Sequence, residues 1–212
     1  MSELRLAYPA SVLADKPEIT AGDVHLLETR VFRPGPSERD DIAVLLALHH
    51  SRSRKCAEWE PFFVDQMVRN VLARITEIGG DTGAVESWMR HTFCRGGVIA
   101  SRAEFRVVVE VVEILRDTCP ELAAFALEQI HIAVAESEGP LASRRNSPWA
   151  TLSTDNLSFA NRILAALGSH TPLTLHQAAR LFDPARNLAG IQHGTAFDEL
   201  IAGLSNSPQV AA

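Results

Sequence analysis

The sequence predicts an all-α protein of about nine helices, arranged as three related helix–loop–helix–helix repeats around a central apolar helix. Two observations lead to this fold class. One is the stretch 98–115, whose apolar residues recur at the spacing of a helix. The other is a set of landmarks that recur along the chain at matching intervals.

The stretch 98–115 reads VIASRAEFRVVVEVVEIL and carries a helix start signal. Ser101 and Glu104 have the spacing of a capping box, in which the hydroxyl accepts from a backbone N–H and the carboxylate reaches back. The β-branched residues also suit a strand, but a strand would place Glu110 and Glu113 on opposite sides. A helix that is apolar around most of its circumference needs cover on several sides, so we expect it at the centre. Its apolar residues are Phe105, Val107, Val108, Val109, Val111, Val112, Ile114 and Leu115.

The first repeat opens at Thr20, which is followed by Asp23 in a cap-like pattern. A first helix over 22–32 ends at the loop RPGP. Ser37 then caps a second helix that contains the apolar run after Asp40. The polar segment SRSRKCAE leads to a third helix over 59–75, which is rich in aromatic residues.

The second and third repeats follow the same order. Thr82 opens a helix that ends near Phe93, the loop CRGG leads into the central helix, and RDTCP precedes a helix over 121–136. In the third repeat, Ser153 or Thr154 opens the first helix and GSHTP forms the loop. The segment DPARNLAGIQHG precedes the last helix.

The intervals between equivalent landmarks support the repeat. Opening caps are separated by 62 and 72 residues, inner caps by 64 and 73, and third-helix aromatics by 62 and 72. The alternative is that any helical protein offers caps and aromatic residues to align. The landmarks are Thr20, Thr82 and Thr154 for the opening caps, Ser37, Ser101 and Thr174 for the inner caps, and Phe63, Phe125 and Phe197 for the aromatics.

The domain organisation follows from these repeats and from composition. We expect an N-terminal arm over 1–18, the first and second repeats over 19–136, and the third repeat over 153–205. A linker over 137–152 is rich in Gly, Pro and Ser. The last residues, 206–212, should form a frayed tail.

Composition limits the functional classes. The chain has 212 residues, 46% hydrophobic residues, a net charge of -6 and a sequence pI near 5.7, which argues against nucleic acid as a partner. No apolar stretch approaches the roughly 18 residues of a membrane span, so no membrane partner is expected. Three cysteines without CxxC spacing are typical of a reducing compartment. We therefore expect a cytoplasmic protein.

The loops GGVIASRAE and TPLTLHQAARLFD, each after an apolar helix, resemble those of EF-hand-like and tellurite-resistance TerB-like helical repeat proteins of bacterial type. Placing the last EF-hand ligand position on Glu104 puts Phe93, Arg95 and Gly97 where acidic ligands belong. The other two repeats also lack loop carboxylates, and the acidic metal-binding positions of TerB-like domains find no clear match. The resemblance therefore implies the architecture, but no calcium site, cofactor or functional residue.

Few residues point to catalysis. Cys94 is the best candidate for a reactive thiol, because His91 lies three residues before it, although a small buried side chain is the alternative. His49 and His50 end a helix, where a cation complements the helix dipole. Glu110 and Glu113 have the spacing of paired carboxylates, and the chain has no HExxH, P-loop, GxSxG or GxGxxG motif. We assign no catalytic, cofactor-binding or metal residue.

The sequence thus predicts a non-catalytic protein-interaction or scaffold module of a bacterial cytoplasm. Its partner is another protein or a second copy of the chain in a homodimer. The candidate contact surface comprises Trp59, Phe62 and Phe63, for which burial in the core is the alternative. The competing hypothesis is a small-ligand or metal-binding enzyme whose site gathers inter-helix histidines and Cys94.

Overall fold

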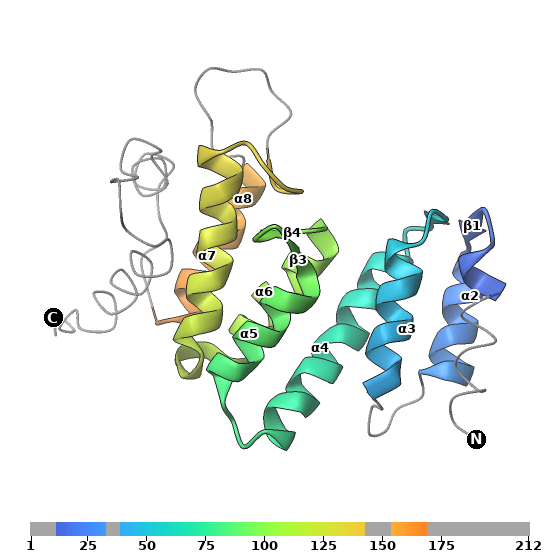
Figure 1. Cartoon of the computed structure of the whole chain (residues 1–212), viewed down its shortest axis with the longest axis horizontal. Coiled ribbons are helices and arrows are strands. Elements are labelled where there is room, and N and C mark those ends of the chain that lie inside the picture. Colours follow the sequence, from blue (N-terminus) through green and yellow to red (C-terminus); the bar gives the residue numbers. More distant parts are fainter. Residues whose placement is uncertain (1–11, 33–38, 143–153, 169–212) are drawn as a thin grey trace, which may run out of the picture. The chain divides into compact units, whose positions relative to one another are not determined.

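The structure is a computed structural model that describes residues 12–32, 39–142 and 154–168 (Figure 1). It is mostly helical, which confirms the all-α class, and its described strands are only two residues long. Among the described helices, none combines the length and the apolar character needed to cross a membrane. Contacts group the chain into two compact units, unit 1 (Met1–Gly80) and unit 2 (Asp81–Ala212).

Unit 1 contains three helical segments and two short strands. Strand β1 (Glu18–Ile19) precedes helix α2 (Ala21–Leu26), which continues as the π-helical turn η1 (Leu27–Val31). Helix α3 (Arg39–His50) is followed by strand β2 (Arg54–Lys55) and helix α4 (Trp59–Glu77). Helix α4 packs against both α2 and α3.

The start of α2 follows the predicted capping chemistry. The Thr20 hydroxyl accepts from the Asp23 N–H, and the Asp23 carboxylate accepts from the Thr20 N–H at 3.0 Å. The Lys16 ammonium also donates to the Asp23 carboxylate, at 2.6 Å. These hydrogen bonds confirm Thr20 as the opening cap and stabilise the carboxylate form, so that the pKa of Asp23 lies below its usual value although burial opposes this.

A short parallel ladder joins the start of unit 1 to the segment before α4. Glu18 pairs with Arg54, and Ile19 pairs with Lys55. The N–H of Arg54 donates to the Pro17 carbonyl at 2.9 Å, just before the ladder. The buried Ser53 hydroxyl donates to the Lys16 carbonyl at 2.6 Å. Residues 16–19 are therefore attached to the segment 53–56, although the sequence analysis places 1–18 in an arm.

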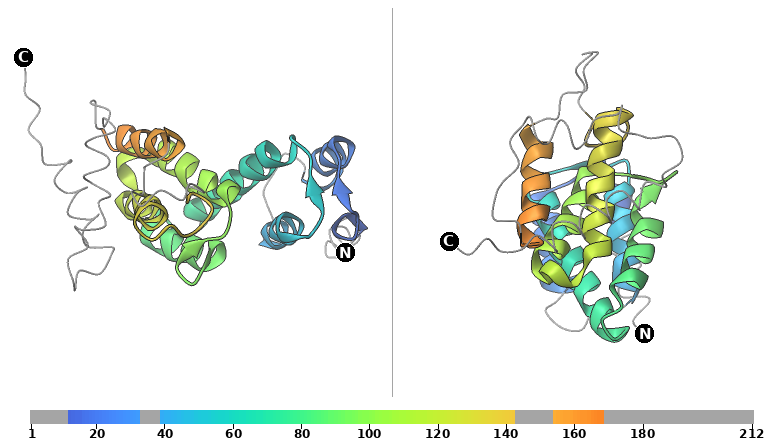
Figure 2. Two further views of the ribbon diagram at one scale, coloured as in Figure 1. Left: turned by 90° about the horizontal axis from the view of Figure 1, so that it is seen from above. Right: turned by 90° about the vertical axis from the view of Figure 1, so that its left-hand side faces the viewer.

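Unit 2 begins with helix α5 (Thr82–Phe93), which leads into the hairpin strands β3 (Cys94–Arg95) and β4 (Val98–Ile99). Helix α6 (Arg102–Leu115), the 3₁₀ turn η2 (Arg116–Thr118), helix α7 (Pro120–Ala135) and helix α8 (Thr154–Ala166) follow. Helices α6, α7 and α8 pack against one another, and α5 packs against α7 (Figure 2). The first helix of the predicted third repeat is thus part of unit 2.

The two-residue turn of the hairpin explains the CRGG sequence. Gly96 and Gly97 both have positive φ, 61° and 87°, which is the backbone form of a tight type I′ hairpin turn. The antiparallel register pairs Cys94 with Ile99 and Arg95 with Val98. Glycine reaches these angles without the steric penalty of a side chain.

Helix α6 has the burial that its sequence predicts. Its residues Phe105, Val107, Val108, Val109, Val111 and Val112 are fully buried. Ser101 is its N-cap, because the hydroxyl accepts from the Glu104 N–H at 3.1 Å. One detail differs from the prediction: Ile114 is 54% exposed. The Glu104 side chain is buried, and α6 is central to unit 2.

Other boundaries need one correction. Helix α5 is capped by Asp81, whose carboxylate accepts from the Ala84 N–H at 2.9 Å, so Thr82 is the first helical residue and not the cap. An aspartate accepts this hydrogen bond as readily as a threonine. The predicted landmarks Ser37, Thr174 and Phe197 lie outside the described residues, as do 143–152 of the linker and the tail 206–212.

The described part of the predicted linker packs against unit 2. Leu141 is buried, and its carbonyl accepts from the Asn156 side chain at 3.0 Å. Gly139 has a φ of +80°, and a Cβ there would lie 2.6 Å from the Val98 side chain. Residues 139–141 therefore belong to the core packing around β4 and α8.

Candidate functional site

The candidate site in unit 1 is built around the end of α3 and the start of α4. His49 lies in the last turn of α3, and Trp59 is the first residue of α4. The Trp59 indole N–H donates to His49 Nδ1 at a distance of 3.2 Å. The His49 ring stacks on the Phe63 ring, with the ring centroids 4.1 Å apart. An accepting Nδ1 carries no proton, so His49 is the neutral tautomer protonated at Nε2.

The surroundings of His49 oppose its protonation. Burial lowers its pKa to about 4, and the positive charges of His50 and Lys55 act in the same direction. A neutral imidazole inside an aromatic cluster is a packing group and a hydrogen-bond acceptor. The pKa of His49, about 4, is far below the value near 7 that suits a general base.

The three aromatic residues expected on a contact surface are inside unit 1. Trp59, Phe62 and Phe63 are 1%, 4% and 0% exposed. Phe62 meets Phe32 edge to face at 5.8 Å, and Trp59 stacks near Phe63. These side chains form the core between α2, α3 and α4, which was the alternative in the sequence analysis. In the structure they offer no exposed surface, so a contact surface has to be formed by other residues.

Helix α3 contains an unbroken apolar run that is only partly buried. All seven residues from 42 to 48 (IAVLLAL) are apolar, yet only Leu45 and Leu48 are buried. The rest of the run is half-buried or exposed. Helical spacing places Ile42, Ala43, Leu46, Ala47 and His50 on one face. We call these five residues the α3 outer face.

Lys55 organises the loop between α3 and β2. Its ammonium donates to the Ser51 carbonyl at 3.1 Å, the Ser51 hydroxyl at 2.9 Å and the Ser53 carbonyl at 2.7 Å. It also lies 5.9 Å from the centre of the Trp59 ring. Burial lowers the pKa of Lys55 from its usual value. The loop thus provides three oxygen acceptors for the three N–H donors of one ammonium.

Cys94 and His91 in unit 2 do not form an activated thiol. Burial raises the pKa of the half-buried Cys94 thiol to about 11, although Arg90 opposes this. His91 is exposed, and no hydrogen bond between His91 and Cys94 is found in the described part of unit 2. A thiol with this pKa is protonated at neutral pH and is a poor nucleophile.

Arg90 forms ion pairs with two glutamates near Cys94. It donates to Glu86 at 2.7 Å and to Glu128 at 2.8 Å, and its guanidinium lies 4.5 Å from the centre of the Phe125 ring. The two carboxylates raise the pKa of Arg90. Arg90, Glu86 and Glu128 therefore connect α5 to α7 as a structural ion-pair network.

Gln129 supports the β3–β4 hairpin and was not identified from the sequence. It is 2% exposed on α7, its Oε1 accepts from the Ile99 N–H at 2.8 Å, and its Nε2 donates to the Gly97 carbonyl at 3.1 Å. This amide holds the β3–β4 hairpin against α7. A lone glutamine in an apolar helix is the sequence signal that could have found it.

The paired carboxylates of α6 are also engaged. Glu113 forms a two-pronged ion pair with Arg162 of α8, at 2.6 and 2.7 Å. Glu110 accepts from Arg106 at 3.3 Å. Both carboxylates are therefore engaged by arginine side chains.

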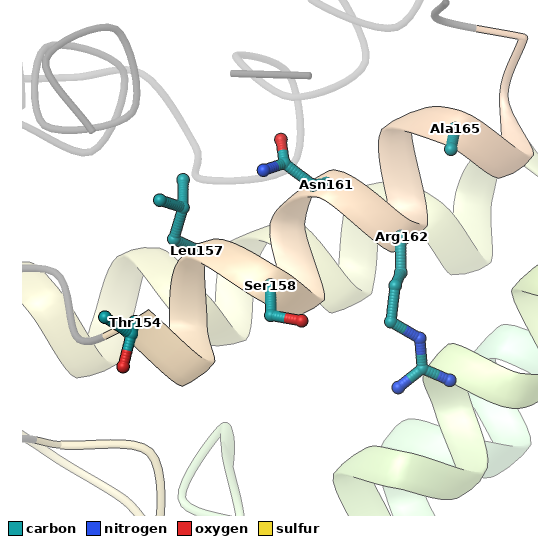
Figure 3. A pocket seen from close by; sticks show the side chains of 6 residues that line it. All are labelled: Thr154, Leu157, Ser158, Asn161, Arg162 and Ala165. Atoms are coloured by element: carbon teal, nitrogen blue, oxygen red, sulfur yellow. The ribbon is translucent and has the colours of Figure 1, made fainter. Parts of the chain in front are cut away.

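A shallow hollow of about 540 Å³ follows one side of α8 (Figure 3). Among the described lining residues, Arg162 alone is charged; it binds Glu113 and points away from Leu157 and Asn161 in Figure 3. The hollow gathers no acid–base pair among these described residues. It is lined by Thr154, Leu157, Ser158, Asn161, Arg162 and Ala165.

No family model, curated protein or solved structure matches the chain. The resemblance to EF-hand-like and TerB-like proteins therefore stays a prediction. A function for this chain has to be argued from the contacts and chemistry of its described residues.

Proposed function

We propose that the chain is a non-catalytic protein-interaction or scaffold module that binds a protein partner through the α3 outer face. The observation that carries this proposal is the seven-residue apolar run of α3, of which only Leu45 and Leu48 are buried. A helix that is apolar on both sides is ordinarily covered on both sides. On the α3 outer face, Ala43, Ala47 and His50 are exposed, and Ile42 and Leu46 are half-buried.

The composition of the α3 outer face indicates what it would bind. Ile42 and Leu46 provide aliphatic contact area, and Ala43 and Ala47 are small, so a second helix can approach closely. His50 is the only polar residue of the five. The partner surface would therefore be an apolar helix face, and hydrophobic burial would be the main source of affinity.

A second copy of the chain satisfies these requirements. A two-fold axis brings the same patch of two copies together, so an apolar face can be its own partner. A homodimer that pairs two α3 outer faces is one form of the proposal. A different protein that presents an apolar helix is the other, and the experiment below separates them.

The titratable groups support a non-catalytic function. The Cys94 thiol has a raised pKa, His49 is neutral and accepts from Trp59, and Glu113 is paired with Arg162. The alternative is a small-ligand or metal-binding enzyme that uses inter-helix histidines and Cys94. As a nucleophile, Cys94 would need a lowered pKa, and as a general base His49 would need a pKa near 7, the reverse of what their surroundings produce.

The lack of a calcium site is part of the proposal. Asp23, the acidic residue of the first cap, binds the Lys16 ammonium, and the oxygens of Ser51 and Ser53 bind Lys55. Internal cations thus occupy the oxygen groups of two turns in unit 1. Calcium would need six or more oxygen ligands, several of them carboxylates.

We also infer that the helices form three related repeats in a module of a reducing cytoplasm. The order of helices in unit 1 (α2, α3, α4) and in unit 2 (α5, α6, α7) supports the first two repeats, and three free thiols support the compartment. The strand ladders of the two units connect different places. The β1–β2 ladder joins the segment before α2 to the segment before α4, whereas the β3–β4 ladder joins the end of α5 to the start of α6. Superposition of experimental coordinates for the two helix triplets tests the repeat.

Photo-crosslinking from position 47 tests the proposed function. A photoreactive amino acid replaces Ala47 in one variant and Ala21 in a matched control, since Ala21 is an exposed helical alanine of the same unit. Irradiation in cells should give adducts from position 47 and few from position 21. An adduct of twice the chain mass identifies the homodimer, and a single different mass identifies a separate partner.

The proposal fails if position 47 gives no more adduct than position 21. Light scattering of the purified protein gives an independent readout. Ala47→Glu should abolish a wild-type dimer or the binding of the identified partner, because it places a charge in the middle of the α3 outer face. Ala21→Glu should preserve both.

A further inference from the structure

We propose that the loop between α3 and β2 is a cation site that carries its own occupant, the ammonium group of Lys55. The site binds a primary ammonium group. This group fixes the start of unit 1 in place whether or not dissolved ions are present. This inference does not depend on the α3 outer face, and its test concerns the loop alone.

The geometry is that of a filled cation site. Three oxygen atoms, from the Ser51 carbonyl, the Ser51 hydroxyl and the Ser53 carbonyl, lie 2.7 to 3.1 Å from one nitrogen. The Trp59 ring lies on another side, with its centre 5.9 Å from the same nitrogen. Aromatic faces and neutral oxygens together favour an organic cation.

The ligand set also indicates which cations the site excludes. All three oxygens are neutral, and no carboxylate is bonded to the Lys55 ammonium among the described residues. Calcium and magnesium require carboxylates or retained water, so a divalent ion gains little here. A primary ammonium has three N–H donors, one for each oxygen.

The same loop fixes the segments around it. Ser51 also donates to the Leu48 carbonyl at 2.8 Å, which attaches the loop to the end of α3. Ser53 donates to the Lys16 carbonyl at 2.6 Å, and Lys55 itself pairs with Ile19 in the β1–β2 ladder. Loss of the ammonium should therefore loosen the ladder as well as the loop.

Hydrogen–deuterium exchange on the full-length protein tests this proposal. Lys55→Ala removes three methylenes and the ammonium, and n-propylammonium replaces what was removed. We expect backbone exchange in 51–56 to rise by about tenfold or more, since hydrogen bonds to charged groups are stronger than neutral ones. Added n-propylammonium should reverse most of this increase.

Three controls separate a cation site from general effects. Tetramethylammonium has the same charge but no N–H donor, so it should not restore protection to Lys55→Ala. Arg52→Ala removes an exposed cation from the same loop, and its exchange should match wild type. Lys55→Met fills the site with a methyl group, so its faster exchange should not respond to n-propylammonium.

Two results would overturn the proposal. One is wild-type exchange in Lys55→Ala and Lys55→Met, and the other is equal protection of Lys55→Ala by n-propylammonium and tetramethylammonium. If Lys55→Ala does not fold, Lys55→Met decides, because methionine keeps an unbranched side chain of similar length. Faster exchange of 51–56 in that variant supports the site, and wild-type exchange refutes it.

Discussion

At the scale of single residues, the structure sets the chemistry of His49 through its neighbours. The ring lies between Phe63 and Trp59, and its Nδ1 accepts the indole hydrogen bond. Burial lowers the pKa of His49 to about 4, whereas an unfolded histidine titrates near 6.5. Between these two pH values, His49 is therefore protonated in the unfolded chain and neutral in the folded chain.

This difference predicts a pH dependence of stability. The stabilisation is fully present above pH 6.5 and is lost as the pH falls from 6.5 towards 4, by about 2–3 kcal/mol in total. His49→Asn keeps an acceptor for Trp59 but cannot titrate. We expect this variant to lose much of the pH dependence when thermal unfolding is followed between pH 7 and 4.5.

His25 gives the matched control for this prediction, since it is an exposed histidine on α2. His25→Asn should keep the wild-type dependence. If His49→Asn retained the full loss of stability on acidification, the neutral state of His49 would not be its cause.

At the scale of secondary-structure elements, an aromatic contact and an ion pair both join α8 to α6. Phe159 is 6% exposed, meets Phe105 edge to face at 5.1 Å, and has the guanidinium groups of Arg102 and Arg162 at 5.5 and 5.7 Å from its ring centre. The Arg162–Glu113 ion pair lies beside it, and both of its side chains are more than a third exposed.

These two contacts should contribute differently to stability. Phe159→Ala leaves a cavity between α6 and α8 and should cost about 3–5 kcal/mol. Arg162→Met removes a partly solvated ion pair and should cost about 1 kcal/mol or less. Urea denaturation of both variants, followed by circular dichroism, compares them. Equal losses of stability in the two variants would contradict this ranking of the two contacts.

At the scale of the whole molecule, contacts divide the chain between Gly80 and Asp81. The aromatic core of α2, α3 and α4 is built from residues of unit 1, and the core around α6 is built from residues of unit 2. The division falls inside the range 19–136, for which the sequence predicts two repeats. Unit 2 begins one residue before Thr82, the residue at which the second predicted repeat opens.

Each unit should fold when it is produced alone. We expect the fragments 1–80 and 81–212 to be helical and to unfold cooperatively, with 1–80 less stable, because a smaller chain buries a smaller fraction of its surface. Circular dichroism and thermal unfolding of each fragment measure this. A fragment that is unfolded alone and gains structure only on mixing with the other would contradict the division.

The helices could be predicted from sequence because their signals are local. Apolar spacing and the caps at Thr20 and Ser101 depend on residues three or four positions apart. The neighbouring Asp81 was a local signal too, and choosing between it and Thr82 required the backbone angles of the turn. Periodicity also identified the buried face of α6 correctly, apart from its exposed end at Ile114.

The candidate sites could not be predicted in the same way. Periodicity shows that Trp59, Phe62 and Phe63 are apolar, but only the packing of Phe32 and His49 decides that they are buried. The oxygens around Lys55 are mostly backbone carbonyls, which every sequence has. Their convergence depends on how the chain turns.

The sequence by itself determined the helical class, the positions of the helices from α2 to α8 and the apolar surface of α6. Those properties depend on side chains that are near one another along the chain. Only the tertiary structure decided that the aromatic residues of α4 are core, that the α3 outer face is half-buried or exposed, and that the Lys55 ammonium binds the oxygens of its own loop. Burial, pKa and hydrogen-bond partners come from residues distant in sequence, so local patterns do not contain them.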